Sequence, residues 1–138
     1  MKTVTIKEVE YVAFRLAQEM MSFNEPIPDF STSFPNILES CLAAPFQTFG
    51  GRSPYRDLIS KLAVLFYLMV KNHPFQNGNK RIAMTTLFVV LHKNRKWLSV
   101  DTQELYNFTM WIAQSPAKAK EETIKATEKF LRSHLTVA

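Results

Sequence analysis

The chain has 138 residues, 46% of them hydrophobic, and carries 17 basic against 12 acidic residues, which gives a net charge of +5. This length suits one domain, residues 1–138, that folds on its own apolar core, and the single Cys41 excludes a framework of internal disulfides. The most apolar stretch, residues 62–70, is far shorter than the roughly 20 residues that cross a bilayer. We therefore expect a cytoplasmic protein that is neither secreted nor inserted into a membrane.

The positive charge is concentrated in one central segment. Residues 58–100 contain seven of the 17 basic residues and none of the 12 acidic ones. Because the rest of the chain is slightly acidic, this distribution favours an anionic ligand bound at one place over a general affinity for polyanions. The seven basic residues are Lys61, Lys71, Lys80, Arg81, Lys93, Arg95 and Lys96.

The first elements in the chain have helical periodicity. Apolar residues in 4–20 recur at helical spacing, and the two prolines in 26–28 prevent this helix from continuing. A short helix is expected over residues 34–44. The next segment, residues 45–53, carries aromatic residues and the pair Gly50-Gly51, which predicts a loop or a short hairpin.

Two very apolar helices are predicted in the centre of the chain. Ser53-Pro54 has the form of an N-cap followed by proline at the first helical position, so the first of these helices is predicted to begin there and to extend through Met69. Residues 72–78 break the pattern, and the second helix is predicted over residues 79–93. We expect these helices to form the central pair of the fold.

Two further helices are predicted before the C-terminus. Asp101 and Glu104 have the spacing of a capping box, which predicts a helix from residue 102. Ser115-Pro116 predicts the start of the last helix. No strand-like alternation lasts more than a few residues, and the sequence therefore predicts an all-α fold.

The loop between the two central helices collects polar residues that a plain connection does not need. A helix that begins at Asn79 would present the N–H groups of its first turn to this loop, which creates an anion site. Gly78 would allow a ligand to approach the backbone, and Lys80 and Arg81 would bind phosphate oxygens. His73 is the only loop residue that titrates near neutrality, so it is the candidate base.

This loop resembles the signature of the Fic/Doc family, His-x-Phe-x-(Asp/Glu)-Gly-Asn-(Gly/Lys)-Arg. It reads His73-Pro74-Phe75-Gln76-Asn77-Gly78-Asn79-Lys80-Arg81 and differs from the signature only at Asn77. Residues 37–45 are also similar to the segment before the family's flap, so the resemblance covers most of the chain. It implies a compact Fic-like helical bundle with a short flap or hairpin before the central helix pair.

The resemblance also implies an activity and a set of site residues. Members of the family transfer part of a nucleoside triphosphate to a hydroxyl of a target protein. By position, His73 would take the proton from a Ser or Thr hydroxyl, and Phe75 would anchor the loop in the core. The residues that would hold the phosphates of ATP are Gly78, Asn79, Lys80 and Arg81. The flap residues that would dock the target as an added strand are Phe46, Gln47, Thr48 and Phe49.

Two positions in the second central helix bear on which group is transferred. Lys80 stands where AMP-transferring members usually have Gly and Doc-like members have Lys, and the family's second Arg would fall at Met84. Both traits imply a Doc-like toxin that transfers phosphate from ATP to a Ser or Thr hydroxyl of a target, for example a translation factor such as elongation factor Tu. Transfer of AMP (AMPylation) is the alternative.

Asn77 departs from the family pattern. The family has Asp or Glu here, and that carboxylate binds the Mg²⁺ that bridges the nucleotide phosphates. An amide oxygen brings no charge, whereas magnesium sites normally depend on one or two carboxylates. Three interpretations stay open: a weak or inactive member that serves as a nucleotide- or protein-binding module, an Asp-to-Asn change that removes toxicity, or another arrangement for the metal.

Two partner classes follow from the sequence. The family's inhibitory helix carries Ser/Thr-x-x-x-Glu, but no Glu in this chain has Ser or Thr four residues before it. The resemblance therefore implies a separate antitoxin that supplies this helix. Nucleic acid is the competing partner class, and the lack of basic residues along one helix face argues against it.

Overall fold

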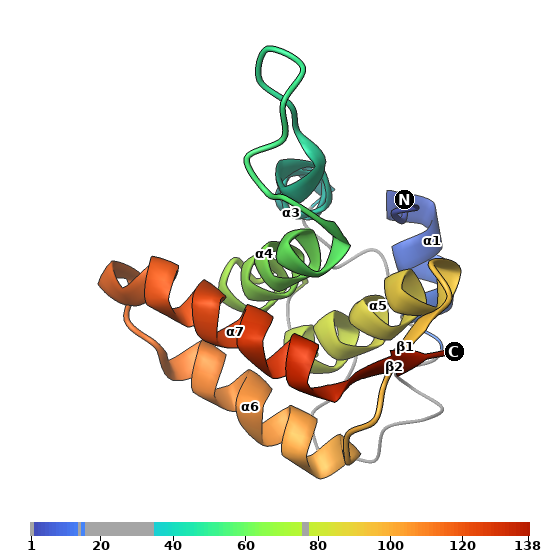
Figure 1. Cartoon of the computed structure of the whole chain (residues 1–138), viewed down its shortest axis with the longest axis vertical. Coiled ribbons are helices and arrows are strands. Elements are labelled where there is room, and N and C mark those ends of the chain that lie inside the picture. The colour runs from blue at the N-terminus through green and yellow to red at the C-terminus, as the bar shows by residue number, and fades with distance from the viewer. Residues whose placement is uncertain (1, 14, 16–34, 76–77) are drawn as a thin grey trace.

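The computed structural model describes residues 2–13, 15, 35–75 and 78–138, and most of these residues are helical (Figure 1). In chain order the elements are α1 (Ile6–Glu8), the π-helix η1 (Val9–Ala13), α3 (Pro35–Ala43), the 3₁₀ turn η3 (Ala44–Phe46), α4 (Leu58–Lys71), α5 (Asn79–Lys93), β1 (Lys96–Leu98), α6 (Thr102–Gln114), the 3₁₀ turn η4 (Ala117–Ala119), α7 (Lys120–His134) and β2 (Leu135–Val137). The predicted all-α fold is confirmed. Within the described ranges, no helix has the length and apolar character needed to cross a membrane.

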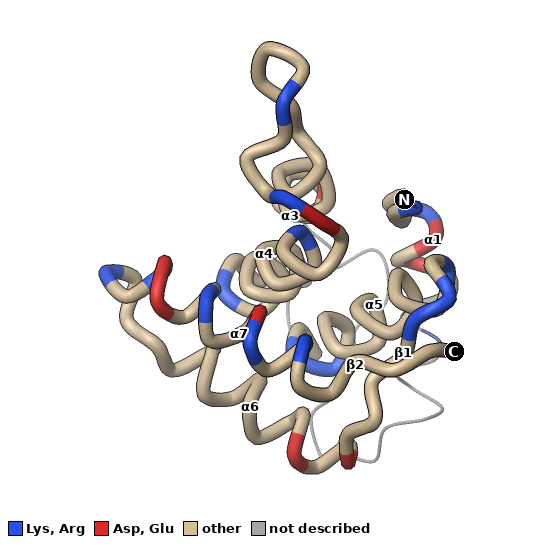
Figure 2. The backbone as a smooth tube through the Cα atoms, in the orientation of Figure 1, with Lys and Arg blue, Asp and Glu red and all other residues tan. Residues whose placement is uncertain are grey.

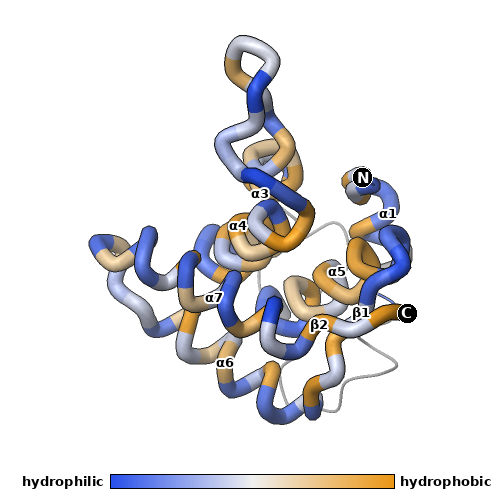
Figure 3. Tube along the Cα trace, in the orientation of Figure 1, coloured by the Kyte–Doolittle hydropathy of each residue, from blue (hydrophilic) through white to orange (hydrophobic). Residues whose placement is uncertain are grey.

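Helix α4 is the centre of the structure. It contacts α3, α5, α6 and α7, and its side chains are buried almost without interruption from Ile59 to Val70. Helix α5 packs beside α4 and also contacts α6, η1 and β1. The hydrophobic residues of α4 and α5 accordingly lie between the surrounding helices (Figure 3). The two helices predicted as the central pair therefore build most of the core.

The start of α4 differs from the prediction. The N-cap is Asp57, whose Oδ1 accepts hydrogen bonds from the backbone N–H of Ser60 at 3.0 Å and from its hydroxyl at 2.9 Å. The pKa of Asp57 is lowered to about 2. The largest cause is the hydrogen bond from the backbone N–H of Ser60, and the Ser60 hydroxyl and the Arg132 guanidinium lower the pKa further. Ser53 instead accepts a bond from the backbone N–H of Tyr55 at 3.2 Å, which forms a local turn. The prediction of a helix start at Ser53-Pro54 was wrong because the Ser53 hydroxyl is used in that turn.

The two C-terminal helices also begin differently from the prediction. Asp101 is the N-cap of α6, but its side chain makes no capping bond, and Glu104 is exposed, so the capping box does not form. Ser115 ends α6, with its hydroxyl donating to the carbonyl of Ile112 at 2.5 Å. The last helix begins only at Lys120, after the turn of η4. The predicted starts were therefore correct for α6 and too early for α7.

Both ends of the described chain lie at the C-terminal end of α5. The strands β1 and β2 pair antiparallel, with Trp97 opposite Thr136, and this short sheet was not predicted. Lys93 binds Glu8 at 2.6 Å, and this bond is the main cause that lowers the pKa of Glu8. Residues 16–34, which include the predicted break at 26–28, lie outside the described residues. The N-terminal segment is thus fixed to the end of α5 that lies farthest from residue 79.

Candidate active site

The candidate site lies where α4 ends and α5 begins. Asn72 closes α4, with its backbone N–H donating to the carbonyl of Leu68 at 2.9 Å, and α5 spans residues 79–93 as predicted. His73 and Asn79 are thereby brought to the same short loop. Asn77, the predicted metal position, lies outside the described residues together with Gln76.

The side chain of Asn79 holds the loop against the start of α5. Its Oδ1 accepts a hydrogen bond from the backbone N–H of Phe75 at 2.9 Å, and its Nδ2 donates to the carbonyl of Phe75 at 2.9 Å. Asn79 is 6% exposed and Phe75 only 1% exposed, so both bonds are shielded from water. If Asn79 contributes to an anion site, it does so through its backbone N–H, because both functional groups of its amide are engaged by the loop.

His73 lies at the surface in an unusual backbone conformation. Its φ is +50°, in the left-handed region, which few residues other than glycine adopt and in which His is several-fold enriched. The Nδ2 of Asn79 lies 3.4 Å from its Nδ1, which makes a long and weak contact. The imidazole is therefore exposed to solvent and oriented mainly by the backbone that carries it.

Positive groups converge on the first turn of α5. Gly78 is the N-cap, with a φ of +73° that favours glycine, and its carbonyl accepts the first helical bond from Ile82 at 3.0 Å. The N–H groups of the next residues have no carbonyl one turn before them in the helix. Lys80 is half-buried, and Arg81 is 6% exposed. The first turn of α5 therefore combines a helix N-terminus with a lysine and an arginine, and this combination suits phosphate.

The described part of the loop does not fit magnesium. It offers an imidazole, amides, an ammonium and a guanidinium, but no carboxylate, and Mg²⁺ normally requires one or two. Across residues 2–13, 15, 35–75 and 78–138, no group of three or more His, Cys, Asp and Glu could hold a metal. The chemistry of this donor set therefore supports phosphate binding and not a resident metal.

The predicted hairpin before α4 is confirmed. The backbone groups of Phe49 and Arg52 bond to each other in both directions, at 2.7 and 3.1 Å, and Gly50 and Gly51 have φ values of +59° and +79°. Positive φ at both central residues is typical of a type I′ turn, the tightest hairpin connection. We call residues 47–52 the flap. It projects beyond the helices (Figure 1), and Phe49 at its tip is 68% exposed.

The predicted flap residues fall into two environments. Gln47, Thr48 and Phe49 are exposed, whereas Phe46 belongs to η3 and is half-buried at the base. The three exposed residues are thus placed to meet a partner, and Phe46 is placed to join the flap to the body.

Three basic residues of the acid-free segment have structural contacts that the sequence did not reveal. Lys61 contacts the base of the flap, Lys71 donates to the carbonyls of Ala113 and Ser115 at 3.3 and 2.5 Å, and Lys93 pairs with Glu8. These residues are spread over the structure and do not form a continuous basic face (Figure 2). The segment therefore combines the predicted phosphate site with unrelated packing contacts. A lysine inside an otherwise apolar run is the signal that could have identified Lys61.

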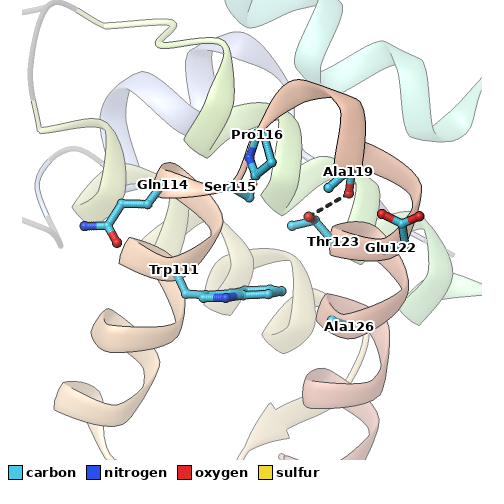
Figure 4. Close-up of a pocket in the computed structure, with 8 residues that line it drawn as sticks. All are labelled: Trp111, Gln114, Ser115, Pro116, Ala119, Glu122, Thr123 and Ala126. Atoms are coloured by element: carbon cyan, nitrogen blue, oxygen red, sulfur yellow. Dashed lines mark hydrogen bonds between the residues drawn. The ribbon is translucent and has the colours of Figure 1, made fainter.

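A separate pocket of about 510 Å³ lies between α6 and α7 (Figure 4). Its lining includes none of the predicted site residues. The residues that form it are Trp111, Gln114, Ser115, Pro116, Ala119, Glu122, Thr123 and Ala126. Its connection to the loop is indirect, because the carbonyl of Ser115 accepts the bond from Lys71 at the end of α4.

Cys41 lies close to the loop but is not a candidate nucleophile. It is fully buried in α3, and this burial raises the pKa of its thiol to about 11, although a hydrogen bond with the Asn72 side chain opposes the effect. A thiol with such a pKa is protonated at neutral pH and therefore unreactive.

Comparisons with known proteins identify a family and a relative of this chain. A family model described as the Fic/DOC family matches residues 4–91, which include the flap and the loop. The curated protein "Toxin Doc" of Mycolicibacterium smegmatis (strain ATCC 700084 / mc(2)155) is 34% identical over 65 residues, which cover 47% of this chain and 50% of that protein. No solved structure gives a significant match. The chain thus aligns with about half the length of this relative, and α6 and α7 lie beyond the range of the family model.

Proposed function

Because the chain belongs to the Fic/Doc family, we propose that it is a Doc-like toxin that transfers the γ-phosphate of ATP to a Ser or Thr hydroxyl of a target protein. The observation that carries the proposal is the loop itself. An exposed imidazole, His73, shares one short loop with a helix N-terminus that carries Lys80 and Arg81. A base and a phosphate-binding site are the two elements that transfer to a hydroxyl requires.

The proposed reaction moves one phosphoryl group and one proton. The hydroxyl oxygen of the target forms a bond to the γ-phosphorus, and the bond between that phosphorus and the β,γ-bridging oxygen breaks. ADP leaves with the electron pair of the broken bond. His73 accepts the hydroxyl proton, and its 3.4 Å contact with Asn79 is weak enough for an approaching hydroxyl to displace.

The remaining loop residues would bind and orient the nucleotide. The backbone N–H groups at the start of α5 and the Lys80 and Arg81 side chains would hold phosphate oxygens and stabilise the charge that develops during transfer. Arg81 is suited to this role because a buried guanidinium binds two oxygens of a phosphate in a fixed geometry. The scheme assigns its steps to residues of this chain, and a carboxylate at position 77 would add the ligand that the family uses for Mg²⁺.

The flap supports docking of the target as an extended segment. Its two arms are joined by one β-bridge, between Phe49 and Arg52, and are exposed, so backbone groups on their outer edges could pair with an extended segment of the target. Gln47, Thr48 and Phe49 would contact the target's side chains. A translation factor such as elongation factor Tu is the type of target that this family resemblance favours, and an antitoxin that supplies an inhibitory helix would be the regulatory partner.

Labelled ATP tests the proposal. The chain and its Asn77→Asp variant are each incubated with a bacterial extract and with purified elongation factor Tu, using ATP labelled on either the γ- or the α-phosphate. We expect the γ-label to appear on a protein and the amount to increase in Asn77→Asp, because a carboxylate restores the family signature.

The other outcomes identify the alternatives. Transfer of the α-label would show AMP transfer and replace the proposed reaction. Transfer of neither label by either form, with ATP still bound in an equilibrium assay, would contradict the proposed activity and leave a nucleotide-binding module. His73→Ala is the matched negative control in every arm.

A further inference from the structure

Lys61 connects both sides of the flap to α4. Its Nζ donates to the hydroxyl of Ser53 and, at 3.0 Å, to the carbonyl of Tyr55, both on the C-terminal side of the flap. The same Nζ lies 5.9 Å from the centre of the Phe46 ring on the N-terminal side, within the range of a cation–π contact. One ammonium group therefore touches the segments that enter and leave residues 47–52.

Neither burial nor helix electrostatics explains a lysine at this position. Lys61 is 6% exposed, and a buried ammonium is costly unless its donors are bonded. It also lies in the first turn of α4, where the positive end of the helix dipole disfavours a cation. Its neighbours Ile59 and Leu62 are buried apolar residues, so an apolar side chain would suit the core equally well. The contacts with the flap base are what a lysine adds here.

Within the described part of the chain, no acidic side chain pairs with the Lys61 ammonium. Among the described residues, the ammonium donates to a hydroxyl and to a carbonyl. The nearest acid in the sequence, Asp57, binds Ser60 and Arg132 instead. The described polar contacts of the Lys61 ammonium are therefore with the base of the flap. This leaves Lys61 bound to groups that move only if the flap base moves.

We propose that Lys61 is a positioning residue that fixes the direction of the flap relative to α4. Helix α4 carries Lys61 near its start and ends at Lys71, two residues before His73. About 15 Å of continuous helix separates these two lysines, at 1.5 Å per residue. Helix α4 would therefore act as a rigid spacer between the flap and His73, with Lys61 joining the flap to it.

The consequence for the reaction rests on the proposed function. If the flap docks the target, a flap held at a fixed angle presents the target hydroxyl at a constant place relative to His73. Loss of the Lys61 contacts should then weaken binding of the target and leave binding of ATP unchanged, because the phosphate site is at the other end of α4.

Spin-label distances test the positioning role without any need for activity. Nitroxides are attached to Thr48→Cys on the flap and Lys129→Cys on α7, both exposed positions, while Cys41 stays unlabelled because it is buried and its thiol pKa is raised to about 11. The distance distribution is measured for the parent pair, for added Lys61→Met and for added Lys71→Met. Methionine keeps the apolar stem of lysine, and thermal unfolding verifies that each variant is folded.

We expect Lys61→Met to broaden the distribution roughly twofold or more, since charged hydrogen bonds at the flap base are lost. Lys71→Met, which removes an ammonium from the opposite end of the same helix, should leave the width unchanged. Lys61→Arg should restore most of the narrow distribution because arginine can donate to the same oxygens. An unchanged width in folded Lys61→Met would overturn the positioning role.

A kinetic arm connects the result to the reaction. For the acceptor protein labelled in the ATP experiment, Lys61→Met should raise the KM for the acceptor about tenfold and leave the KM for ATP unchanged. Equal KM values for the acceptor would contradict the docking consequence even if the distances change. If no acceptor is labelled in any form, the proposed function fails, and the distance measurement still decides the role of Lys61.

Discussion

The two ends of α4 use the same kind of side chain for different purposes. At the start, Lys61 opposes the helix dipole, is buried and contacts the flap base. At the end, Lys71 lies where the helix dipole favours a cation, is half-buried and donates to the carbonyls of Ala113 in the last turn of α6 and of Ser115, its C-cap. One lysine connects the helix to a projecting hairpin, and the other connects it to the neighbouring helix.

The difference shows how the site is divided. Several contacts hold the described residues of the loop end: the two hydrogen bonds between the Asn79 side chain and the Phe75 backbone, the buried Phe75 ring and the Lys71 contacts with the end of α6. Among described residues, the flap end combines one buried ammonium with a two-residue turn. Chemistry on a phosphate requires closely fixed groups, and several contacts supply them at the loop end, whereas the direction of the flap is proposed to depend on Lys61 alone. The following variants break or sharpen this division, from the largest expected effect to the smallest.

Removal of the imidazole at the loop end should have the largest effect. His73→Ala should lower the rate of label transfer by roughly 10²–10⁴-fold, the usual contribution of a general base. Because His73 is exposed, the free energy of unfolding should change little. His92→Ala is the matched control, since His92 is exposed at the opposite end of α5 and should leave the rate unchanged. A His73→Ala enzyme as fast as the parent would exclude the proposed base.

Loss of the two hydrogen bonds between the Asn79 side chain and the Phe75 backbone should have the largest effect on stability. Asn79→Ala leaves the N–H and carbonyl of Phe75 without their partner in a buried place, which should lower the free energy of unfolding by roughly 2–4 kcal/mol. Urea denaturation measures this loss. Asn107→Ala, at an exposed position of α6, is the control and should cost no more than about 0.5 kcal/mol. Equal effects of the two substitutions would show that the stability of the protein does not depend on the Asn79–Phe75 hydrogen bonds.

The structures at the two ends of α4, the hairpin and the His73 loop, were only partly predictable from the sequence. The bounds of α5 and the hairpin were predicted correctly because apolar periodicity, proline and the Gly50-Gly51 pair act over a few neighbouring residues. The position of the loop between two buried helices followed for the same reason. These features depend on local chemistry, which a sequence displays directly.

The features that were missed depend on residues far apart in the chain. The pairing of β1 with β2 joins segments about 40 residues apart, and Lys71 contacts residues 113 and 115. The two hydrogen bonds between the Asn79 side chain and the backbone of Phe75 were not predicted. Ser53 was predicted to cap α4, but its hydroxyl accepts from Tyr55 and Lys61, so the cap falls to Asp57. Several partners compete for each polar group, and only the folded structure shows which one binds it.

The cap at the flap end should have a moderate, pH-dependent effect. Asp57→Ala should cost about 1 kcal/mol near neutral pH, because Ser60 loses its cap. The folded pKa of Asp57, about 2, lies below its ordinary value, so its stabilisation is complete above about pH 4 and disappears as the pH falls through about 2.

Urea midpoints of Asp57→Ala and the parent at pH 7, 4 and 2 measure this dependence. The gap, which is the difference between the two midpoints at each pH, should close toward pH 2. Asp101→Ala is the matched control, since Asp101 occupies the same position in α6 without a capping bond and should cost a few tenths of a kcal/mol at any of these pH values. A gap that stays constant down to pH 2 would show that the Asp57 carboxylate does not stabilise the cap through its charge.

The smallest effect is expected at the other end of the same helix. Lys71→Met should lower the free energy of unfolding by about 0.5 kcal/mol, because a half-buried ammonium that bonds two carbonyls contributes less than a buried one. The change should instead be visible locally. The amide of Asn72, which donates to Leu68, should exchange with deuterium faster in Lys71→Met and at the parent rate in Lys61→Met.

Lys125→Met, an exposed lysine of α7, controls for loss of one positive charge and should alter neither quantity. If Lys61→Met accelerated exchange at Asn72 as much as Lys71→Met does, the two ends of α4 would be coupled through the helix. The flap and the His73 loop would then respond to each other, and the division between a docking end positioned by Lys61 and a chemical end held by several contacts would have to be abandoned.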